Sequence, residues 1–282
     1  MSKILNGKEI AKTIKDKLKE EIKHTNAKIG FAAILVGNDE ASKIYVNLKQ
    51  KAAEYIGIDF QRFDLSEDTS EKEVIDIIKS LNKNPHIHGI LVQLPLPSHL
   101  NTDNIILQID PLKDADGFHP ENTKLLFENK EYIISPPISA IMRMIEETNK
   151  DISGKQCLIM ANSHKFADPI KHLLERKGCR VQKLIKEKNF SSLSKEADIL
   201  ITAIGRPRLI KAEDIKQGAI LIDVGISRLP DGKVAGDLDF ESVKEKAGYS
   251  TPVPGGIGPL TVAYLFYNTF KLYKKSLYQN AQ

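Results

Sequence analysis

The chain has 282 residues, of which 41% are apolar and 28% are charged, with a formal net charge of +4. This length predicts two domains that each bury a core of their own, and the composition is typical of an ordinary globular protein. The lysines are spread along the chain without a concentrated basic tract, which argues against nucleic-acid binding, although a mild positive field suits anionic ligands.

The N-terminal segment predicts an amphipathic helix, because Ile10, Ile14, Leu18 and Ile22 share one stripe. Such a charged helix is not a signal peptide, and no apolar run reaches the roughly 18 residues of a membrane span. The two cysteines lack metal-binding or redox spacing and form no disulfide scaffold. We therefore expect no metal site, no membrane partner and a reducing, cytoplasmic location.

Short apolar runs alternate with amphipathic helices along the whole chain. In the first half, buried parallel strands are predicted at 31–37 and 89–94, and helices at about 40–56 and 71–81. In the second half, a helix at about 138–148 leads to predicted strands at 157–161, 180–184, 198–203 and 219–224, followed by a last helix at 261–277. The crossovers of the second half suit a Rossmann-type sheet, so the predicted fold class is α/β with two domains.

Tyr45 and Lys49 stand four residues apart on the second predicted helix, so their side chains project from one face. Asn38 or Asp39 is suited to cap the start of this helix, and Gly57 is suited to a left-handed cap at its end. Taken alone, a tyrosine above a lysine is more typical of a solvated helix face.

The segment TPVPGGIGPLT, residues 251–261, combines three prolines with three glycines. Prolines fix φ and remove backbone donors, while glycines allow positive φ and close approach, so the loop exposes backbone to a ligand. Pro252, Gly255 and Gly256 are therefore candidate substrate-binding residues. The alternative interpretation is a tight turn that leads into the last helix.

Five motifs in sequence order point to one family: SKIYVNLKQKA at 42–52, VQLPLP at 92–97, KDADGF at 113–118, DVGI at 223–226 and the Pro/Gly loop. Over nearly its whole length, the chain resembles the bifunctional methylenetetrahydrofolate dehydrogenase/methenyltetrahydrofolate cyclohydrolase family.

This resemblance implies an N-terminal α/β folate-binding domain of residues 1–139 plus 263–282, to which the C-terminal helix returns. Residues 140–262 are then a Rossmann-type dinucleotide-binding domain. The ligands implied are tetrahydrofolate derivatives and NADP, with NAD as the alternative cofactor. The resemblance also implies a homodimer in cytoplasmic one-carbon metabolism and purine biosynthesis.

Four residues of the first domain match catalytic positions of this family. Cyclohydrolase chemistry adds water to the amidinium-like carbon of methenyltetrahydrofolate and needs a proton shuttle, and burial lowers the pKa of a lysine such as Lys49 toward that task. Tyr45 is expected to stack on the folate, Gln93 to hold the lysine, and Asp116 to accept hydrogen bonds from the pterin edge. The alternatives are a strand-end role for Gln93 and a turn role for Asp116 before Gly117.

The predicted cofactor site departs from the family pattern. Where the family carries G-R-S-x-x-V-G-x-P, this chain reads ANSHKFADP, so Ala161 and Ala167 replace glycines and Asn162 replaces an arginine. If the backbone needs positive φ there, each alanine costs about 1 kcal/mol, and the lost arginine removes a planar fork for a 2′-phosphate. Asp168 and Pro169 are suited to be the N-cap and N1 residues of the next helix.

A second departure is IKEK, residues 185–188, which replaces a His-Ser-x-Thr-like segment, and Ser139 stands where the family has a glycine. Lys165 and Lys186 are candidates to replace the lost arginine as point charges, which favours NADP, and no acidic residue ends that strand to favour NAD. The candidate cofactor-binding residues are Ala161, Asn162, Ser163, Lys165, Lys186, Gly205 and Ile226.

Three functions are compatible with these motifs. The first is the bifunctional enzyme, which oxidises 5,10-methylenetetrahydrofolate with NADP and hydrolyses the methenyl product to 10-formyltetrahydrofolate. The second is a cyclohydrolase with an impaired dehydrogenase half and weak cofactor binding. The third is a non-catalytic folate-binding protein.

Overall fold

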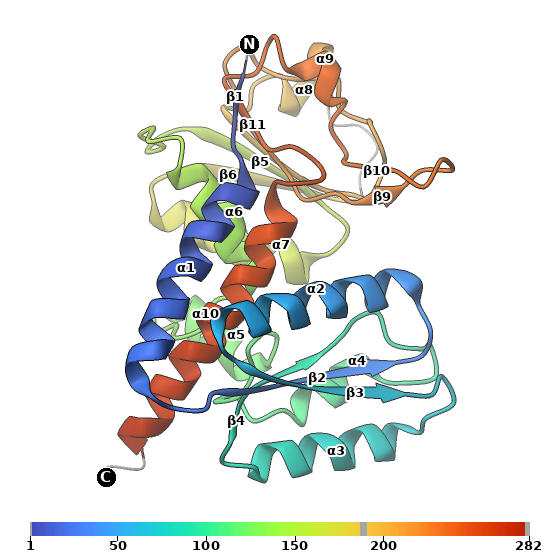
Figure 1. The fold of residues 1–282 in the computed structure, drawn as a ribbon. Coiled ribbons are helices and arrows are strands. Elements are labelled where there is room, and N and C mark those ends of the chain that lie inside the picture. The colour runs from blue at the N-terminus through green and yellow to red at the C-terminus, as the bar shows by residue number, and fades with distance from the viewer. Residues whose placement is uncertain (1, 187–190, 280–282) are drawn as a thin grey trace. The chain divides into compact units, whose positions relative to one another are not determined.

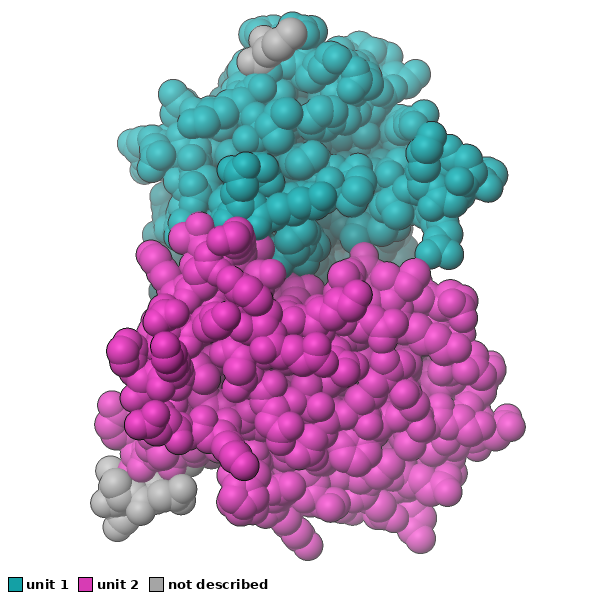
Figure 2. Space-filling model, viewed as in Figure 1, with its two compact units in different colours: residues 1–10, 137–261 teal, residues 11–136, 262–282 magenta. Residues whose placement is uncertain are grey.

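The computed structural model describes residues 2–186 and 191–279, which are called the described residues below. By their internal contacts they divide into two compact units (Figure 1, Figure 2). Unit 1 comprises Met1–Ile10 and Pro137–Thr261, and unit 2 comprises Ala11–Pro136 and Val262–Gln282. Among the described residues, no helix is long and apolar enough to cross a membrane.

Unit 2 is built on a three-stranded parallel sheet with the order β3-β2-β4. Its strands are β2 (Gly30–Val36), β3 (Asp59–Leu65) and β4 (Ile87–Val92). Its helices are α2 (Glu40–Ile56), α3 (Glu71–Lys83), α4 (Thr102–Leu107) and α5 (Pro120–Phe127), together with most of α1 (Gly7–Thr25) and α10 (Ile257–Gln279). The helices predicted at the N-terminus, at about 40–56, at about 71–81 and at the C-terminus are confirmed, as are the two predicted strands, whereas β3 was not predicted.

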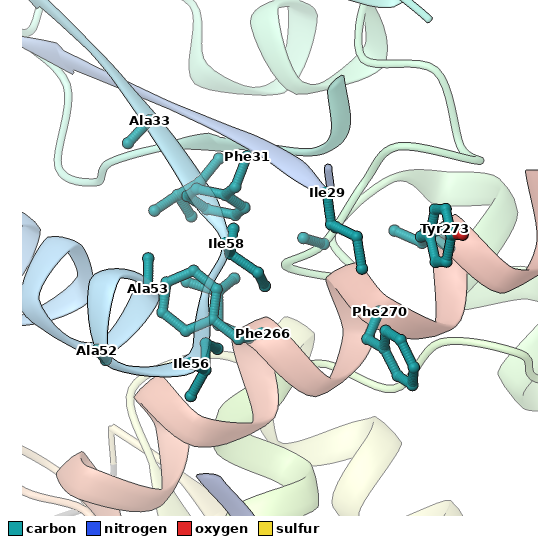
Figure 3. Packing of buried hydrophobic residues seen from close by; sticks show 14 of the residues in the cluster. Ile29, Phe31, Ala33, Ala52, Ala53, Ile56, Ile58, Phe266, Phe270 and Tyr273 are labelled. Atoms are coloured by element: carbon teal, nitrogen blue, oxygen red, sulfur yellow. The ribbon is translucent and has the colours of Figure 1, made fainter. Parts of the chain in front are cut away.

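Alternate residues of β2 face two separate hydrophobic cores. Phe31, Ala33 and Leu35 pack with α2, and Ala32, Ile34 and Val36 pack with α3, so these helices cover opposite faces of the sheet (Figure 1). Helix α10 joins the first of these cores through Leu265, Phe266, Phe270, Leu272 and Tyr273 (Figure 3). The Phe266 ring meets the Phe31 ring edge-on, with 5.2 Å between the ring centroids.

Unit 1 is built on a six-stranded sheet with the order β1-β11-β8-β7-β5-β6, and every pairing in it is parallel. Its strands are β1 (Lys3–Ile4), β5 (Gln156–Ala161), β6 (Arg180–Ile185), β7 (Ile199–Ala203), β8 (Ile220–Asp223) and β11 (Tyr249–Ser250). The first ten residues belong to this unit because β1 pairs with β11.

The remaining elements of unit 1 are helices and one small hairpin. The helices are α6 (Pro136–Glu146), α7 (His164–Arg176), α8 (Ser191–Ser194), α9 (Phe240–Val243) and the 3-10 turn η1 (Ala212–Asp214). Strands β9 (Ser227–Arg228) and β10 (Val234–Ala235) form a separate antiparallel pair. The central strands β5, β7 and β8 are almost completely buried, as expected for a parallel sheet covered on both faces. The α/β fold class and the Rossmann-like second half are confirmed.

Candidate active site

Helix α2 carries Tyr45 and Lys49 one turn apart, and Lys49 is among its buried residues. Its start is capped by Asp39, whose carboxylate accepts a 2.7 Å hydrogen bond from the Ser42 N–H, and its end by Gly57 with φ of 88°. Both predicted caps are therefore confirmed, with Asp39 and not its neighbour at the N-cap. Lys49 is buried with only 9% of its surface exposed, which contradicts the interpretation of a solvated face.

The Lys49 ammonium group donates a 2.8 Å hydrogen bond to Oε1 of Gln93. Gln93 follows β4 directly and is itself fixed at two points. Its backbone N–H donates to the Ile34 carbonyl at 2.8 Å, and its Nε2 donates to the Leu94 carbonyl at 2.7 Å. Because the amide nitrogen is already used, the amide oxygen points toward the lysine, so Gln93 does more than satisfy a strand end.

The turn that contains Asp116 is held by its neighbour Asp114. The buried Asp114 carboxylate accepts hydrogen bonds from the N–H of Gly117 at 3.0 Å, the N–H of His119 at 2.8 Å and Nδ2 of Asn122 at 2.9 Å. The turn role considered for Asp116 therefore belongs to Asp114, and the Asp116 carboxylate is left for electrostatic interaction with Lys49.

Burial shifts the pKa values of the Lys49 and Asp116 side chains toward each other. Desolvation lowers the pKa of Lys49 from its ordinary value, and the nearby Asp116 only partly opposes this effect. Desolvation also raises the pKa of Asp116 to about 6, against the attraction of Lys49 and with a smaller contribution from Asp114. Both shifts favour the neutral forms of the two groups, and a lowered lysine pKa is the direction that acid–base catalysis by this side chain requires.

Tyr45 stands one turn before Lys49 and is half-buried. Burial raises the pKa of its phenol, so the hydroxyl stays protonated and able to donate at neutral pH. Tyr45, Lys49, Gln93 and Asp116 all belong to unit 2.

The Pro/Gly loop belongs to unit 1 and is tightly folded on itself. Gly255 has φ of 113°, and a Cβ atom at Gly256 would lie 2.6 Å from the Pro252 carbonyl oxygen. Helix α10 begins at Ile257, four residues before its predicted start, so the second half of the loop is its first turn. The substrate-binding role of Pro252, Gly255 and Gly256 stays a prediction.

A cavity of about 220 Å³ lies at the carboxyl ends of β5, β6 and β7 in unit 1. It is lined by Met160, Ala161, Asn162, Leu184, Lys186, Ile204 and Arg206. Apolar walls with polar and cationic groups at the carboxyl edge of a parallel sheet fit the adenosine end of a dinucleotide. The structure thus brings together three of the predicted cofactor-binding residues, Ala161, Asn162 and Lys186.

The other predicted cofactor-binding residues lie near the same edge of the sheet but do not line this cavity. Ser163 is the N-cap of α7 and accepts a hydrogen bond from the Phe166 N–H, and Lys165 is exposed in the first turn of this helix. Gly205 has φ of 73° in the loop after β7, and Ile226 is 49% exposed after β8. Their roles stay predictions.

Two expectations about the loop after β5 are wrong. Ala161 is the last residue of β5, and Ala167 is buried within α7, so both have ordinary backbone conformations and neither stores the strain expected of a replaced glycine. Ser163 begins the helix, so Asp168 lies inside it and pairs with Lys183. The second half of the segment 185–188, Glu187 and Lys188, lies outside the described residues.

The sequence interpretation missed Arg206 and the carboxylates that shape its loop. The buried Asp237 accepts hydrogen bonds at 2.7 Å from the N–H groups of Ile204 and Arg206. The buried Asp223 accepts from the N–H groups of Asp237 and Leu238, and burial raises its pKa to about 7. The motif GDLDF contains Asp237, but the sequence does not show which backbone groups that carboxylate binds.

Comparison with known families decides the relationship. Residues 5–116 match the model of the catalytic domain of tetrahydrofolate dehydrogenase/cyclohydrolase, and residues 136–277 match the model of its NAD(P)-binding domain. The chain belongs to the tetrahydrofolate dehydrogenase/cyclohydrolase family. The family resemblance drawn from five sequence motifs is thereby confirmed.

Relatives within this family cover almost the whole chain. The bifunctional protein FolD of Acetivibrio thermocellus is 44% identical over 278 residues, which are 97% of each chain. The crystal structure of FolD from Campylobacter jejuni has a TM-score of 0.94 at 38% identity and covers 98% of this chain and 100% of its own. The Trypanosoma brucei enzyme, solved with NADP and an inhibitor, has a TM-score of 0.93 at 30% identity and covers 98% of both chains.

The two candidate sites lie in different regions matched by the family models. Tyr45, Lys49, Gln93 and Asp116 lie in the catalytic-domain match, and the cavity beside β5 to β7 lies in the NAD(P)-binding match. In the part of the chain that the structure describes, no group of three or more His, Cys, Asp or Glu side chains could hold a metal ion.

Proposed function

We propose that this chain catalyses both reactions of its family. It oxidises 5,10-methylenetetrahydrofolate to the methenyl form with NADP, and it hydrolyses the methenyl form to 10-formyltetrahydrofolate. Family membership makes the protein an oxidoreductase and a hydrolase of folate one-carbon metabolism. The observation that carries the proposal is the buried hydrogen bond from Lys49 to Gln93, with the carboxylate of Asp116 close by.

Hydrolysis needs a proton acceptor and a proton donor at the same carbon. In our proposal, neutral Lys49 takes a proton from water as the water oxygen bonds to the amidinium-like carbon. The lysine then returns this proton to the ring nitrogen as the carbon–nitrogen bond breaks, and the remaining hydroxyl proton is released to solvent as the formyl C=O bond forms. The lowered pKa of Lys49 supports this role, because a larger fraction of the amine is neutral at physiological pH.

In this proposal, Gln93 orients the lysine, and Asp116 and Tyr45 bind the folate. Gln93 fixes the position of the Lys49 ammonium group through Oε1. The Asp116 carboxylate accepts hydrogen bonds from the amino and N–H edge of the pterin, which is a bidentate, charge-assisted contact when the acid is ionised. The ring of Tyr45 stacks on the folate, and its hydroxyl donates a hydrogen bond.

The oxidation of 5,10-methylenetetrahydrofolate depends on how the protein positions the folate and NADP. When bound, NADP accepts the hydride from the methylene carbon, so the protein needs to hold the two reactants in register. Ala161, Asn162 and Lys186, which line the cavity at the edge of the unit 1 sheet, are proposed to hold its adenosine end.

We also propose that the enzyme is a homodimer. Strand β3 is an edge strand of the unit 2 sheet, with one hydrogen-bonding edge not used by β2. On the adjoining helix α2, Ile44 and Leu48 are 44% and 49% exposed and lie one turn apart. A second copy that covered these groups would remove apolar surface from water and pair an open edge. Light scattering of Leu48→Glu, which should be monomeric, tests this assignment.

We place the enzyme in the cytoplasm, as a supplier of 10-formyltetrahydrofolate for purine biosynthesis. The cysteines Cys157 and Cys179 are both unpaired and buried, and burial raises the pKa of each thiol. Unreactive thiols of this kind are typical of proteins in a reducing compartment.

Two absorbance assays of methenyltetrahydrofolate test the proposed function. Its formation from 5,10-methylenetetrahydrofolate should require NADP, and its disappearance should be accelerated by the enzyme without any nucleotide. Accelerated disappearance without formation would leave only the cyclohydrolase. Folate binding without either reaction would show a binding protein.

A further inference from the structure

The cavity at the carboxyl ends of β5, β6 and β7 contains two cationic side chains, Lys186 and Arg206. Within the described residues, neither of them forms an ion pair, and none of the residues that line the cavity is acidic. Two positive charges that have no ion-pair partner among the described residues, beside apolar walls, favour a ligand that combines a flat apolar group with an anion.

Lys186 is fixed in place by its backbone. It comes directly after β6, with φ of 58°, and its N–H donates a 3.0 Å hydrogen bond to the Ala161 carbonyl at the end of β5. In a Rossmann sheet, the end of the second strand faces the adenosine ribose. An acidic residue there binds the ribose hydroxyls of NAD, whereas a cation accommodates the 2′-phosphate of NADP.

Arg206 is fixed by a different set of contacts. Its N–H and that of Ile204 donate to the two oxygens of the buried Asp237, so this loop has a defined path after β7. Nδ2 of Asn162 also donates to the Ile204 carbonyl at 2.7 Å, which ties the loop after β7 to the loop after β5. Asn162 thus acts as a tether, and the positive charge on that side of the cavity comes from Arg206.

One basic side chain of β6, that of Lys183, is already engaged. The Lys183 ammonium group pairs with Asp168 and lies 3.1 Å from Nδ1 of His164. Its charge is therefore neutralised on the surface of α7. Lys186 and Arg206 remain as the pair of cations that line the cavity.

We propose that Lys186 and Arg206 together bind the 2′-phosphate of NADP and give this chain its preference for NADP over NAD. The inference rests on the proposed function, because it presumes a dinucleotide at this edge of the sheet. Asp237 is a positioning residue in this arrangement, since it acts through the backbone of Arg206. A planar guanidinium with a mobile ammonium group can contact three phosphate oxygens at once.

Calorimetric titration of the protein without folate provides the test, with NADP, NAD and 2′,5′-ADP as separate ligands. The double variant Lys186→Gln/Arg206→Gln should weaken NADP and 2′,5′-ADP binding by about tenfold or more, while the dissociation constant of NAD changes by less than about threefold. Arg208→Gln is the matched control, because Arg208 is also exposed and lies in the same loop but does not line the cavity.

The outcomes separate this proposal from the proposed function. Equal weakening of NADP and NAD, or an unchanged preference for NADP in the double variant, would overturn the role of the two cations. The dehydrogenase assay of the unmodified enzyme with NADP tests the function independently. The double variant is expected to need a higher NADP concentration than Arg208→Gln to reach half of its maximal dehydrogenase rate.

Discussion

The Lys49 ammonium group and the Gln93 amide oxygen are joined by a buried hydrogen bond of 2.8 Å, and the amide nitrogen of Gln93 is held by the Leu94 carbonyl. Only one orientation of the Gln93 amide allows its oxygen to accept from Lys49 while its nitrogen donates to Leu94. Lys49 is buried, is held by this hydrogen bond and has a lowered pKa, which distinguishes it from the many exposed lysines of this chain. These properties suit a side chain that transfers protons.

Lys49→Met should lower the cyclohydrolase rate by about 10²-fold or more, the usual contribution of a positioned acid–base group. Methionine has a similar volume and an apolar chain, so the variant should fold and still bind folate. The rate is followed by the loss of methenyltetrahydrofolate absorbance. Lys51→Met, on the exposed side of the same helix, is the control and should retain its activity. A rate for Lys49→Met within a few-fold of the unmodified enzyme would contradict the assignment.

Asp116→Asn should remove a pH dependence of folate binding. Burial raises the pKa of Asp116 to about 6, so the carboxylate that accepts the pterin hydrogen bonds is lost as the pH falls below 6. Folic acid, which carries the same amino and carbonyl edge, should therefore bind the unmodified protein more weakly at pH 5 than at pH 7. The variant should bind weakly at both pH values. Titration by fluorescence quenching measures both curves, and parallel curves would exclude Asp116 as the anchor.

Asp116 should lower the stability of the fold as the pH rises, although the same rise in pH strengthens folate binding. A carboxyl group with a raised folded-state pKa stabilises the protein at pH values below its unfolded pKa, and this contribution is lost as the pH rises through about 6. Asparagine does not ionise, so the free energy of unfolding of Asp116→Asn, relative to the unmodified protein, should increase between pH 4 and pH 7. Urea denaturation at both pH values measures this difference.

Asp114→Ala should destabilise the fold and thereby separate the two aspartates of KDADGF. The Asp114 carboxylate accepts hydrogen bonds from Gly117, His119 and Asn122. Its removal leaves the backbone N–H groups of Gly117 and His119 without this acceptor, whereas Asn122 keeps a hydrogen bond to the Pro111 carbonyl. The expected loss is about 3 kcal/mol or more of the free energy of unfolding. Urea denaturation of Asp114→Ala and Asp116→Asn at the same pH provides the comparison. Equal stabilities would mean that the turn does not depend on Asp114.

The sequence predicts those parts of the fold that a local signal determines. Asp39 and Gly57 mark the ends of α2, and continuous apolar runs mark the buried strands β2 and β4. Strand β3, with the sequence DFQRFDL, was missed because it is largely half-exposed, so it has neither a continuous apolar run nor a strict alternation.

Contacts between distant residues account for most of what the sequence could not predict. KDADGF contains two aspartates, and only the structure shows that Asp114 accepts the hydrogen bonds that hold the turn while Asp116 is attracted electrostatically by Lys49. Asp168 before Pro169 has the composition of a helix start, yet Ser163 caps α7 five residues earlier. Arg206 carries no local signal, because its position depends on the carboxylate of Asp237, 31 residues away.

Phe266→Ala should show that α10 is an integral part of unit 2. The Phe266 side chain is fully buried and packs edge-on against Phe31, so its truncation creates a cavity that costs about 3–5 kcal/mol. Tyr267→Ala is the control, because the neighbouring Tyr267 is 41% exposed. Thermal denaturation of both variants measures the difference, and a Phe266→Ala midpoint equal to that of the control would mean that α10 contributes little to this core.

Gly225→Ala should disturb the loop that holds Arg206. A Cβ atom at Gly225 would lie 2.3–2.4 Å from the Asp237 carboxylate, which cannot move without losing its hydrogen bonds to the Ile204 and Arg206 N–H groups. The displaced loop should weaken NADP binding by about tenfold, or ~1.4 kcal/mol. Gly258→Ala is the matched control, since an added Cβ there meets no atom within 4 Å. Calorimetry measures both affinities, and unchanged binding by Gly225→Ala would mean that the path of this loop does not determine the cofactor site.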